Sequence, residues 1–274
     1  MSEKQPVVLL AQPLGSRQAH FDAVVSAIGQ TSAGKLRVEY CPKGTSSLPQ
    51  TFNLAWVQAL ANRGKYDYFA MLHSDVAPSP LWLDVLYDEI TRTKATAVSA
   101  VVAIKDVKGV TSTAVGLVDD DFDYRRITLT ENRKLPQTYG MADVQAANLW
   151  PGFDFAQRCL LINTGCWIAD MSWPHWYNVH PDGRYEFCYE QKHRIQVWAD
   201  GSAHAEFAPE DWLVSRYIHR HGGTCMATKL VRTLHWGDQP YPNDQVWGAE
   251  TDIEIDRYQA DREAVRLAAQ PAAV

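Results

Sequence analysis

Long hydrophobic runs are missing from this sequence, and their absence excludes a common class of membrane protein. No apolar stretch approaches the roughly 20 residues that a membrane-spanning helix needs. The first residues, Met1–Pro6, are polar, and the apolar run behind them, Val7–Ala11, has the length of a strand rather than of a secretory signal. We therefore expect a protein without a transmembrane segment.

Paired cysteines and glycine-rich phosphate loops are also missing. The five cysteines are scattered and none forms a C-x-x-C pair, which predicts reduced packing residues in a cytoplasmic protein rather than a disulfide framework or a zinc site. Neither a G-x-G-x-x-G fingerprint nor a Walker sequence is present. The chain therefore lacks the phosphate-binding devices of dinucleotide-binding Rossmann proteins and P-loop proteins.

An excess of positive charge is the third absence. The chain has 26 Lys and Arg against 32 Asp and Glu, a net charge of −6, so it has no overall basic field for nucleic acid or an anionic membrane. What is present is ordinary for a globular protein, with 46% hydrophobic and 21% charged residues. A length of 274 residues suffices for one large core or two modest ones.

Apolar strands and amphipathic helices alternate through the first third of the chain. Apolar residues recur at helical spacing over His20–Ile28 and Phe52–Leu60, and again after Ser79-Pro80, which we interpret as an N-cap followed by a proline at the first helical position. The predicted strands are Val7–Ala11, Leu36–Tyr40, Tyr68–Leu72 and Ala97–Ile104. This alternation predicts an α/β fold with a mainly parallel central sheet flanked by helices.

The second half of the chain is less regular. Its predicted elements are a hairpin at Lys105–Val110, strands at Arg158–Ile162 and Thr224–Thr233, and a helix at Pro209–His221. An aromatic-rich insertion spans Ser172–Phe207, and we expect most of its rings to pack against the domain. The acidic run Asp119–Asp123 is interpreted as a solvated loop.

The chain shows no internal repeat and no flexible linker. We therefore predict one domain over residues 1–240, with one half at about 1–110 and a second at about 111–240. Residues 241–274 are predicted to form a C-terminal tail that is helical over Glu250–Ala269.

The most informative segment is His73-Ser74-Asp75, which follows the predicted strand Tyr68–Leu72. Side chains alternate along a strand, so His73 and Asp75 are expected on one face. They would lie at the carboxyl end of the strand, where open α/β sheets bind ligands. Imidazole and carboxylate ligands suit a divalent cation such as Mn²⁺ or Mg²⁺, and such an ion would hold a diphosphate. The alternative is a strand end whose aspartate only caps the next turn.

Four segments together resemble the GT-A-fold glycosyltransferases, most closely family 2 and its relatives. They occur in the order of that family over roughly residues 5–240. They are Ser46–Ala55 followed by His73-Ser74-Asp75, then Asn163–Trp167, Pro209-Glu210-Asp211-Trp212, and Leu234-His235-Trp236-Gly237. The resemblance implies a GT-A-like, single-domain α/β fold and transfer of a sugar from a nucleotide diphosphate sugar to a hydroxyl group.

The resemblance also implies a metal site. The family usually begins its D-x-D motif with aspartate, and this chain has His73 there. Asp75 is the first expected ligand, His235 the second and His73 the third. A site that contains imidazole suits Mn²⁺ better than Mg²⁺. For His235 the alternative is a buried histidine stacked on Trp236.

Catalysis and acceptor binding are assigned by the same resemblance. Asp211, or its neighbour Glu210, is expected to remove the proton of the acceptor hydroxyl in an inverting reaction. The alternative is that both carboxylates cap the helix that they begin. The residues expected on the acceptor side are Asn163, Thr164, Gly165, Trp212 and Trp236.

Donor binding is expected at the other half of the site. Gln12 and Pro13 follow the first predicted strand, where the family has its nucleobase-binding loop, and Asn53 and Ser74 lie near the same pocket. The expected donor is a UDP- or GDP-sugar. The acceptor class stays open among saccharide, protein, lipid head group and modified nucleobase.

Two other functions are compatible with the sequence. A nucleotidyltransferase has a similar nucleotide-binding half, but Leu14-Gly15-Ser16-Arg17 is only a thin version of its phosphate loop. A non-catalytic nucleotide-sugar-binding or carbohydrate-binding protein would explain the histidine in place of the first aspartate. Hydrolysis or transfer of a bound donor distinguishes an enzyme from such a protein.

Overall fold

The computed structural model describes residues 5–14, 20–29, 34–197 and 201–248. The predicted phosphate-loop segment Gly15–Arg17 and the predicted tail helix Glu250–Ala269 lie outside these residues, as does Trp198 of the insertion.

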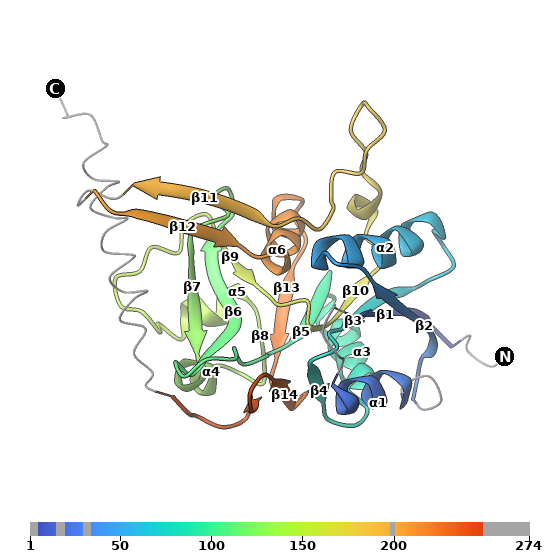
Figure 1. Cartoon of the computed structure of the whole chain (residues 1–274), viewed down its shortest axis with the longest axis horizontal. Coiled ribbons are helices and arrows are strands. Elements are labelled where there is room, and N and C mark those ends of the chain that lie inside the picture. The colour runs from blue at the N-terminus through green and yellow to red at the C-terminus, as the bar shows by residue number, and fades with distance from the viewer. Residues whose placement is uncertain (1–4, 15–19, 30–33, 198–200, 249–274) are drawn as a thin grey trace.

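A seven-stranded sheet forms the centre of the molecule (Figure 1). Its strand order is β2 (Arg37–Gly44), β1 (Val7–Leu14), β3 (Tyr68–Leu72), β10 (Cys166–Asp170), β5 (Ala97–Ala100), β13 (Cys225–Thr228) and β8 (Thr138–Tyr139). Only β10 and β8 run opposite to the other five strands. The predicted α/β fold with a mainly parallel central sheet is confirmed.

Helices cover both faces of this sheet because its strands are apolar on both sides. Val7, Leu9 and Ala11 of β1 face one buried cluster, while Val8 and Leu10 face the other. The first cluster contains residues of α2 (Leu48–Ala61) and α6 (Glu210–Arg220), and the second contains residues of α1 (Phe21–Gly29) and α3 (Trp82–Thr93). The short helices are α4 (Leu129–Lys134), α5 (Met141–Ala146) and the 3₁₀ helix η1 (Pro174–Tyr177).

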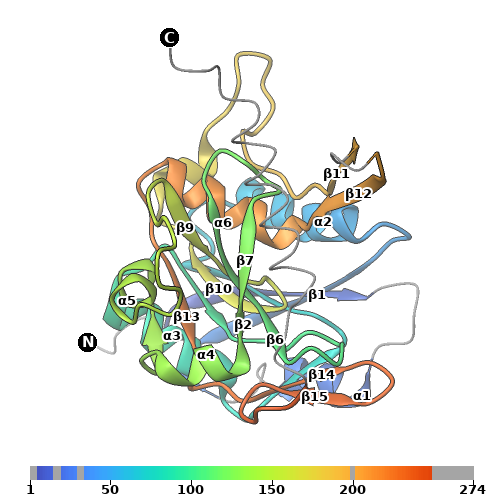
Figure 2. The same ribbon diagram turned by 90° about the vertical axis from the view of Figure 1, so that its left-hand side faces the viewer.

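Three smaller sheets surround the central one. One has the order β15 (Pro240–Pro242), β14 (Thr233–Trp236) and β4 (Val76–Pro78), and another has the order β7 (Tyr124–Thr128), β6 (Val110–Leu117) and β9 (Arg158–Leu161). The third is a hairpin of β11 (Lys192–Val197) and β12 (Ala203–Ala208). Figure 2 shows β6, β7 and β9 on the side that lies at the left in Figure 1.

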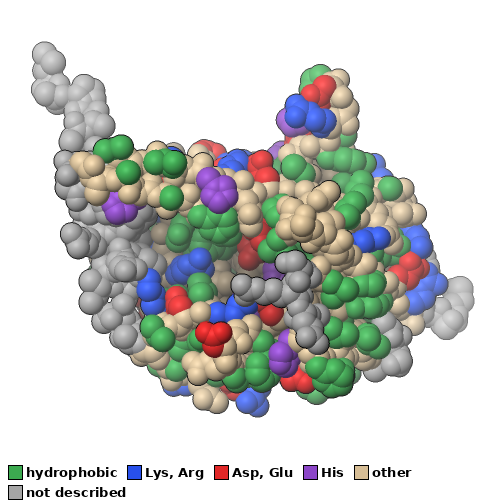
Figure 3. All heavy atoms as spheres, viewed as in Figure 1, with side chains coloured by type: hydrophobic (Ala, Val, Ile, Leu, Met, Phe, Trp, Pro, Cys, Tyr) green, Lys and Arg blue, Asp and Glu red, His purple; other side chains and the backbone are tan. Residues whose placement is uncertain are grey.

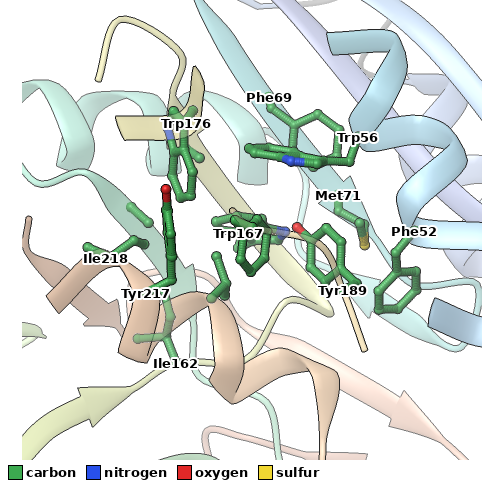
Figure 4. Close-up of a cluster of buried hydrophobic side chains, with 14 of the residues drawn as sticks. Phe52, Trp56, Phe69, Met71, Ile162, Trp167, Trp176, Tyr189, Tyr217 and Ile218 are labelled. Carbon is green, nitrogen blue, oxygen red and sulfur yellow. The ribbon is translucent and has the colours of Figure 1, made fainter. Parts of the chain in front are cut away.

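Aromatic rings from both halves of the chain fill the larger buried cluster (Figure 4). The Trp56 ring of α2 packs edge-on against Phe69 at a centroid distance of 4.9 Å and against Trp176 of the insertion at 5.0 Å. Phe187 and Tyr189 of the insertion are also buried. The prediction that most insertion aromatics pack against the domain is confirmed for these residues.

Several predicted boundaries are wrong because long-range pairing decides them. Ser79-Pro80 does not begin a helix. Val76–Pro78 instead pairs with β14, which keeps the chain extended, and α3 begins at Trp82 after Leu81 in the left-handed region (φ 58°). The predicted strand Thr224–Thr233 is divided between β13 in the central sheet and β14 in the small one.

Two further predictions need correction. The strand predicted over Ala97–Ile104 ends at Ala100, after which Ala103 forms only an isolated bridge with Thr111. Helix α1 is present as predicted, but it buries Ala23 and Ala27, and its larger apolar residues Phe21, Val25 and Ile28 are exposed.

Candidate functional site

Asp75 and His235 are brought together by the pairing of β4 with β14. The register places His235 opposite Val76, directly after Asp75, and the Trp236 N–H donates to the Asp75 carbonyl at 2.8 Å. His235 Nε2 then lies 3.5 Å from Asp75 Oδ2. Sequence proximity does not suggest this pair, because it depends on a short strand that local patterns did not predict.

The orientation of His235 is set by a backbone carbonyl. Its Nδ1 lies 2.7 Å from Ala103 O, and because a carbonyl oxygen only accepts hydrogen bonds, Nδ1 carries the proton. Nε2 then faces Asp75: it can donate to that carboxylate when the ring is protonated, and it is free to bind a cation when the ring is neutral. This is the arrangement in which metal-binding histidines are usually held.

Asp75 carries a second cationic neighbour that sequence reasoning missed. The Lys105 ammonium forms an ion pair with the same oxygen, Asp75 Oδ2. Burial acts to raise the pKa of the Asp75 carboxyl, but the hydrogen bond and charge of His235, together with His73 and Lys105, hold that pKa well below its ordinary value. Asp75 is therefore a stable carboxylate.

His73 lies at the end of β3 with its ring against Phe52, at a centroid distance of 5.0 Å. Its Nε2 is buried and has no hydrogen-bond partner. Burial lowers the pKa of His73, although the negative charges of Asp75 and Glu210 act in the opposite direction. His73 is thus a neutral imidazole placed between the two acidic parts of the site.

Glu210 and Asp211 begin helix α6, as predicted, but neither caps it. The N-cap position is Pro209 and no side chain bonds there. Glu210 is 5% exposed and accepts a hydrogen bond from Gln191 Nε2 at 3.0 Å. Asp211 accepts a hydrogen bond from the Thr164 hydroxyl.

Both of these carboxyl groups are harder to ionise than usual. Burial, followed by the charge of Asp211, raises the pKa of Glu210. Burial also raises the pKa of Asp211, against the hydrogen bonds from Thr164 and the charges of Arg126 and His235. Asp211 is bonded to Thr164, and the next residue, Gly165, accepts from the His73 N–H, so the two acidic groups lie on adjoining segments of one site. Figure 3 shows acidic, basic and histidine side chains inside a hollow near the middle of this face.

Most residues predicted to contact the acceptor are buried supports instead. Asn163 is 2% exposed, and its side chain donates to Ala100 O and accepts from the N–H groups of Gly165 and Cys166. Thr164 holds Asp211, and the Gly165 carbonyl accepts from His73 N–H at 2.8 Å. These residues orient Asp211 and His73 rather than presenting a surface.

The two tryptophans predicted on the acceptor side differ from each other. Trp212 is 1% exposed and donates from its indole nitrogen to Ser112 O, so it is a core residue. Trp236 is partly buried and stacks on His20 at a centroid distance of 3.9 Å. His20 N–H also donates to Ser74 O at 2.8 Å. The ring stacked on Trp236 is therefore His20, which sequence reasoning missed, and not His235.

The residues predicted to bind the donor are mainly structural as well. Gln12 and Pro13 do not form a loop, because both lie within β1. Gln12 is fully buried, donates to Ala23 O and accepts from the Tyr40 hydroxyl. Asn53 bonds to both the N–H and the carbonyl of Tyr189, and so ties the insertion to α2.

The acidic run Asp119–Asp123 is only partly the solvated loop that we predicted. The Asp119 side chain is 86% exposed, but that of Asp121 is 14% exposed and pairs with Lys192 at 2.8 Å. The fully buried Arg216 donates to Leu117 O and to Asp123 O. This loop therefore ties the start of β11 to the domain, and part of its negative charge is paired with a basic side chain of the protein.

The side chains of this site could supply two ligands to a divalent cation, but not a complete coordination shell. Within the described ranges, no three His, Cys, Asp or Glu side chains come together as a complete cage. Divalent cations that bind phosphates commonly take only one or two protein ligands, and phosphate and water supply the rest. Asp75 Oδ2 and His235 Nε2 fit such a two-residue seat.

Comparisons with known proteins add little to this geometry. No protein-family model matches the sequence, and no curated protein matches it. Among solved structures, the crystal structure of A197 from STIV is similar with a TM-score of 0.47 and 13% identity, over 90% of this chain and 95% of that chain. A similarity of this size supports no conclusion about function. In the part of the chain that the structure describes, no helix is long and apolar enough to cross a membrane.

Proposed function

We propose that this chain is a GT-A-like glycosyltransferase that moves a sugar from a nucleotide diphosphate sugar to a hydroxyl group. The proposal rests on one observation: two sets of acidic side chains with opposite ionisation behaviour lie in one site. One is an ionised carboxylate with a histidine and an ammonium (Asp75, His235 and Lys105). The other is a pair of buried carboxyl groups, Glu210 and Asp211, with raised pKa values. Unlike pairs of this kind are typical of catalytic sites.

In this proposal Asp211 is the general base. The acceptor oxygen attacks the anomeric carbon, its proton passes to an Asp211 oxygen, and the bond from that carbon to the departing diphosphate breaks, with inversion. A carboxylate with a raised pKa accepts a proton more readily than an ordinary one. The Thr164 hydroxyl donates to one Asp211 oxygen and so fixes the position of the carboxylate. Glu210 is the alternative base.

The other side of the site would hold the donor. Asp75 and His235 would bind Mn²⁺, or Mg²⁺, and that ion when bound would act as a Lewis acid for the departing diphosphate. Ser74 lies between His73 and Asp75, where it would contact a UDP- or GDP-sugar. The stacked rings of Trp236 and His20 would form one wall of the site. Reduced thiols fit a cytoplasmic location for this reaction.

The first test is a thermal-unfolding screen of nucleotide sugars with and without Mn²⁺. A ligand that binds the folded state raises the midpoint in proportion to ln(1 + [L]/Kd). We expect one UDP- or GDP-sugar to stabilise the protein, and more so with Mn²⁺. If no nucleotide sugar stabilises the protein, the donor assignment is wrong.

The second test addresses catalysis. Asp211→Asn should keep donor binding and lose turnover by about 100-fold or more, the usual size of a general-base effect. Asp88→Asn is a matched control, because that carboxylate lies on α3, is 53% exposed and pairs with the exposed Lys35. Full turnover in Asp211→Asn would refute the assignment of the base. Donor binding without turnover in the wild type would instead favour a non-catalytic binding protein, and transfer of a nucleotidyl group would favour a nucleotidyltransferase.

A further inference from the structure

Lys105 is the member of the Asp75 group to which the proposed function assigns no role. It lies directly after Ile104 on the segment that joins β5 to β6, and its side chain is 34% exposed. Its ammonium contacts Asp75 Oδ2, the oxygen that also faces His235 Nε2. A cation thus already occupies the carboxylate that would take a divalent ion.

The backbone on both sides of Lys105 is fixed. Ala103 bridges to Thr111 and accepts a hydrogen bond from His235, and Ile104 N–H donates to Val110 O at 3.0 Å. The methylene groups of Lys105 pack against Gly237. A Cβ atom added to Gly237 would lie only 3.1 Å from Lys105 Cδ. Only the end of the side chain, whose ammonium contacts Asp75, therefore has freedom to move.

We propose that Lys105 is a donor-binding residue that exchanges one anionic partner for another. Without donor, its ammonium neutralises Asp75. When a nucleoside diphosphate enters with a divalent cation, the cation takes Asp75 Oδ2 and the freed ammonium pairs with the diphosphate. This inference rests on the proposed function, because it names the residue that recognises the diphosphate of that same donor.

The exchange makes a distinctive prediction because an ammonium and a divalent cation at the same carboxylate oxygen repel each other and compete for its negative charge. Removal of the ammonium frees Asp75 for a metal ion and removes a partner of the diphosphate. The same substitution should therefore strengthen the binding of the metal ion and weaken the binding of the diphosphate. If Lys105 had only a structural role, its substitution would weaken the binding of both ligands or of neither.

The experiment measures two ligands separately on the full chain by titration calorimetry. In Lys105→Met, binding of Mn²⁺ alone should tighten by about tenfold, and binding of UDP or GDP at saturating Mn²⁺ should weaken by about tenfold, the size of one charge-assisted hydrogen bond. Lys105→Arg keeps the charge and should behave like the wild type for both ligands. Lys108→Met, on the same segment, is the control for loss of a nearby charge.

Each result decides the matter. Unchanged or weaker Mn²⁺ binding in Lys105→Met overturns the exchange, as does the absence of Mn²⁺ binding in both proteins. Unchanged binding of the diphosphate overturns the role in donor recognition. If neither UDP nor GDP binds any of the proteins while Mn²⁺ binding still tightens in Lys105→Met, the proposed function fails and the competition for Asp75 stands.

Discussion

Glu210 and Asp211 illustrate at the scale of single residues how position in the fold overrides a local rule. A helix N-terminus normally favours ionised carboxylates through its dipole and free N–H groups. Here burial outweighs that effect and raises both pKa values. The site therefore contains two carboxylates that cost stability when both are ionised, which is common where residues are arranged for catalysis.

We predict that Glu210→Gln stabilises the ligand-free protein at neutral pH by on the order of 1 kcal/mol, because it removes a buried charge beside Asp211. The amide keeps an oxygen for the hydrogen bond from Gln191. A raised pKa in the folded state means that wild-type stability is fully present below the unfolded pKa of about 4.3 and is lost as the pH rises through the folded pKa. The advantage of the variant should therefore grow as the pH rises above about 4.3.

Urea unfolding between pH 4 and pH 8, followed by circular dichroism, checks this prediction. The control is Glu190→Gln, since the Glu190 side chain is 52% exposed and lies next to Gln191 in the chain. A variant at Glu210 that is less stable than the wild type at every pH would show that the carboxylate stabilises the fold.

The β11–β12 hairpin is unusual at the scale of elements because its polar face is turned inward. Arg194 pairs with Glu206 on that face, and Lys192 pairs with Asp121 of the acidic loop. The outward face carries Ile195 and Val197, which are 80% and 66% exposed. Figure 3 shows apolar side chains along the outer side of the hairpin, at upper left. The hairpin is joined to the domain by the Lys192–Asp121 ion pair and by the Arg194 guanidinium, which lies over the Phe122 ring at 4.3 Å from its centroid.

Substitutions in and near this hairpin should therefore have unequal effects. We expect Ile195→Thr to change the free energy of unfolding by less than about 0.5 kcal/mol, because the side chain makes no buried contact that could be lost. Phe187→Ala, in the buried cluster of the same insertion, should cost about 3–5 kcal/mol. Chemical denaturation of the two variants measures both values. A large loss in Ile195→Thr would mean that the outer face is covered in solution.

The whole molecule is organised by one strand that joins its two halves. β10 comes from the second half of the chain, yet it lies between β3 and β5, which both come from the first half. The larger buried cluster likewise combines Trp56 and Phe69 with Trp167, Trp176 and Tyr217 (Figure 4). Neither half can complete the sheet or the core alone.

We therefore predict that a fragment of residues 1–110 does not fold, because β3 and β5 would lack the strand between them. Its far-UV circular dichroism should resemble that of an unfolded chain, and the full chain should unfold in one transition by both fluorescence and circular dichroism. A cooperatively folded fragment would show that the halves are separate domains.

Much of the fold was predictable from local patterns. The strand Tyr68–Leu72 was predicted to the residue, and helix α6 within one residue at each end, because hydrophobic periodicity and chain breakers act over short stretches. The position of His73 and Asp75 at a strand end followed from the same pattern. The boundaries that failed, at Ser79-Pro80 and Thr224–Thr233, depend on the pairing of β4 with β14.

The sequence by itself determined the alternation of strands and helices, and hence an α/β sheet with polar residues at its carboxyl edge. The tertiary structure alone decided which of those residues face the site. Buried hydrogen bonds occupy the side chains of Asn163, Thr164 and Gln12. The fold also brings Lys105 to Asp75 from a different segment. The reason is physical: hydrophobic periodicity along the sequence indicates which side chains are buried, but a contact between distant segments depends on which strands pair.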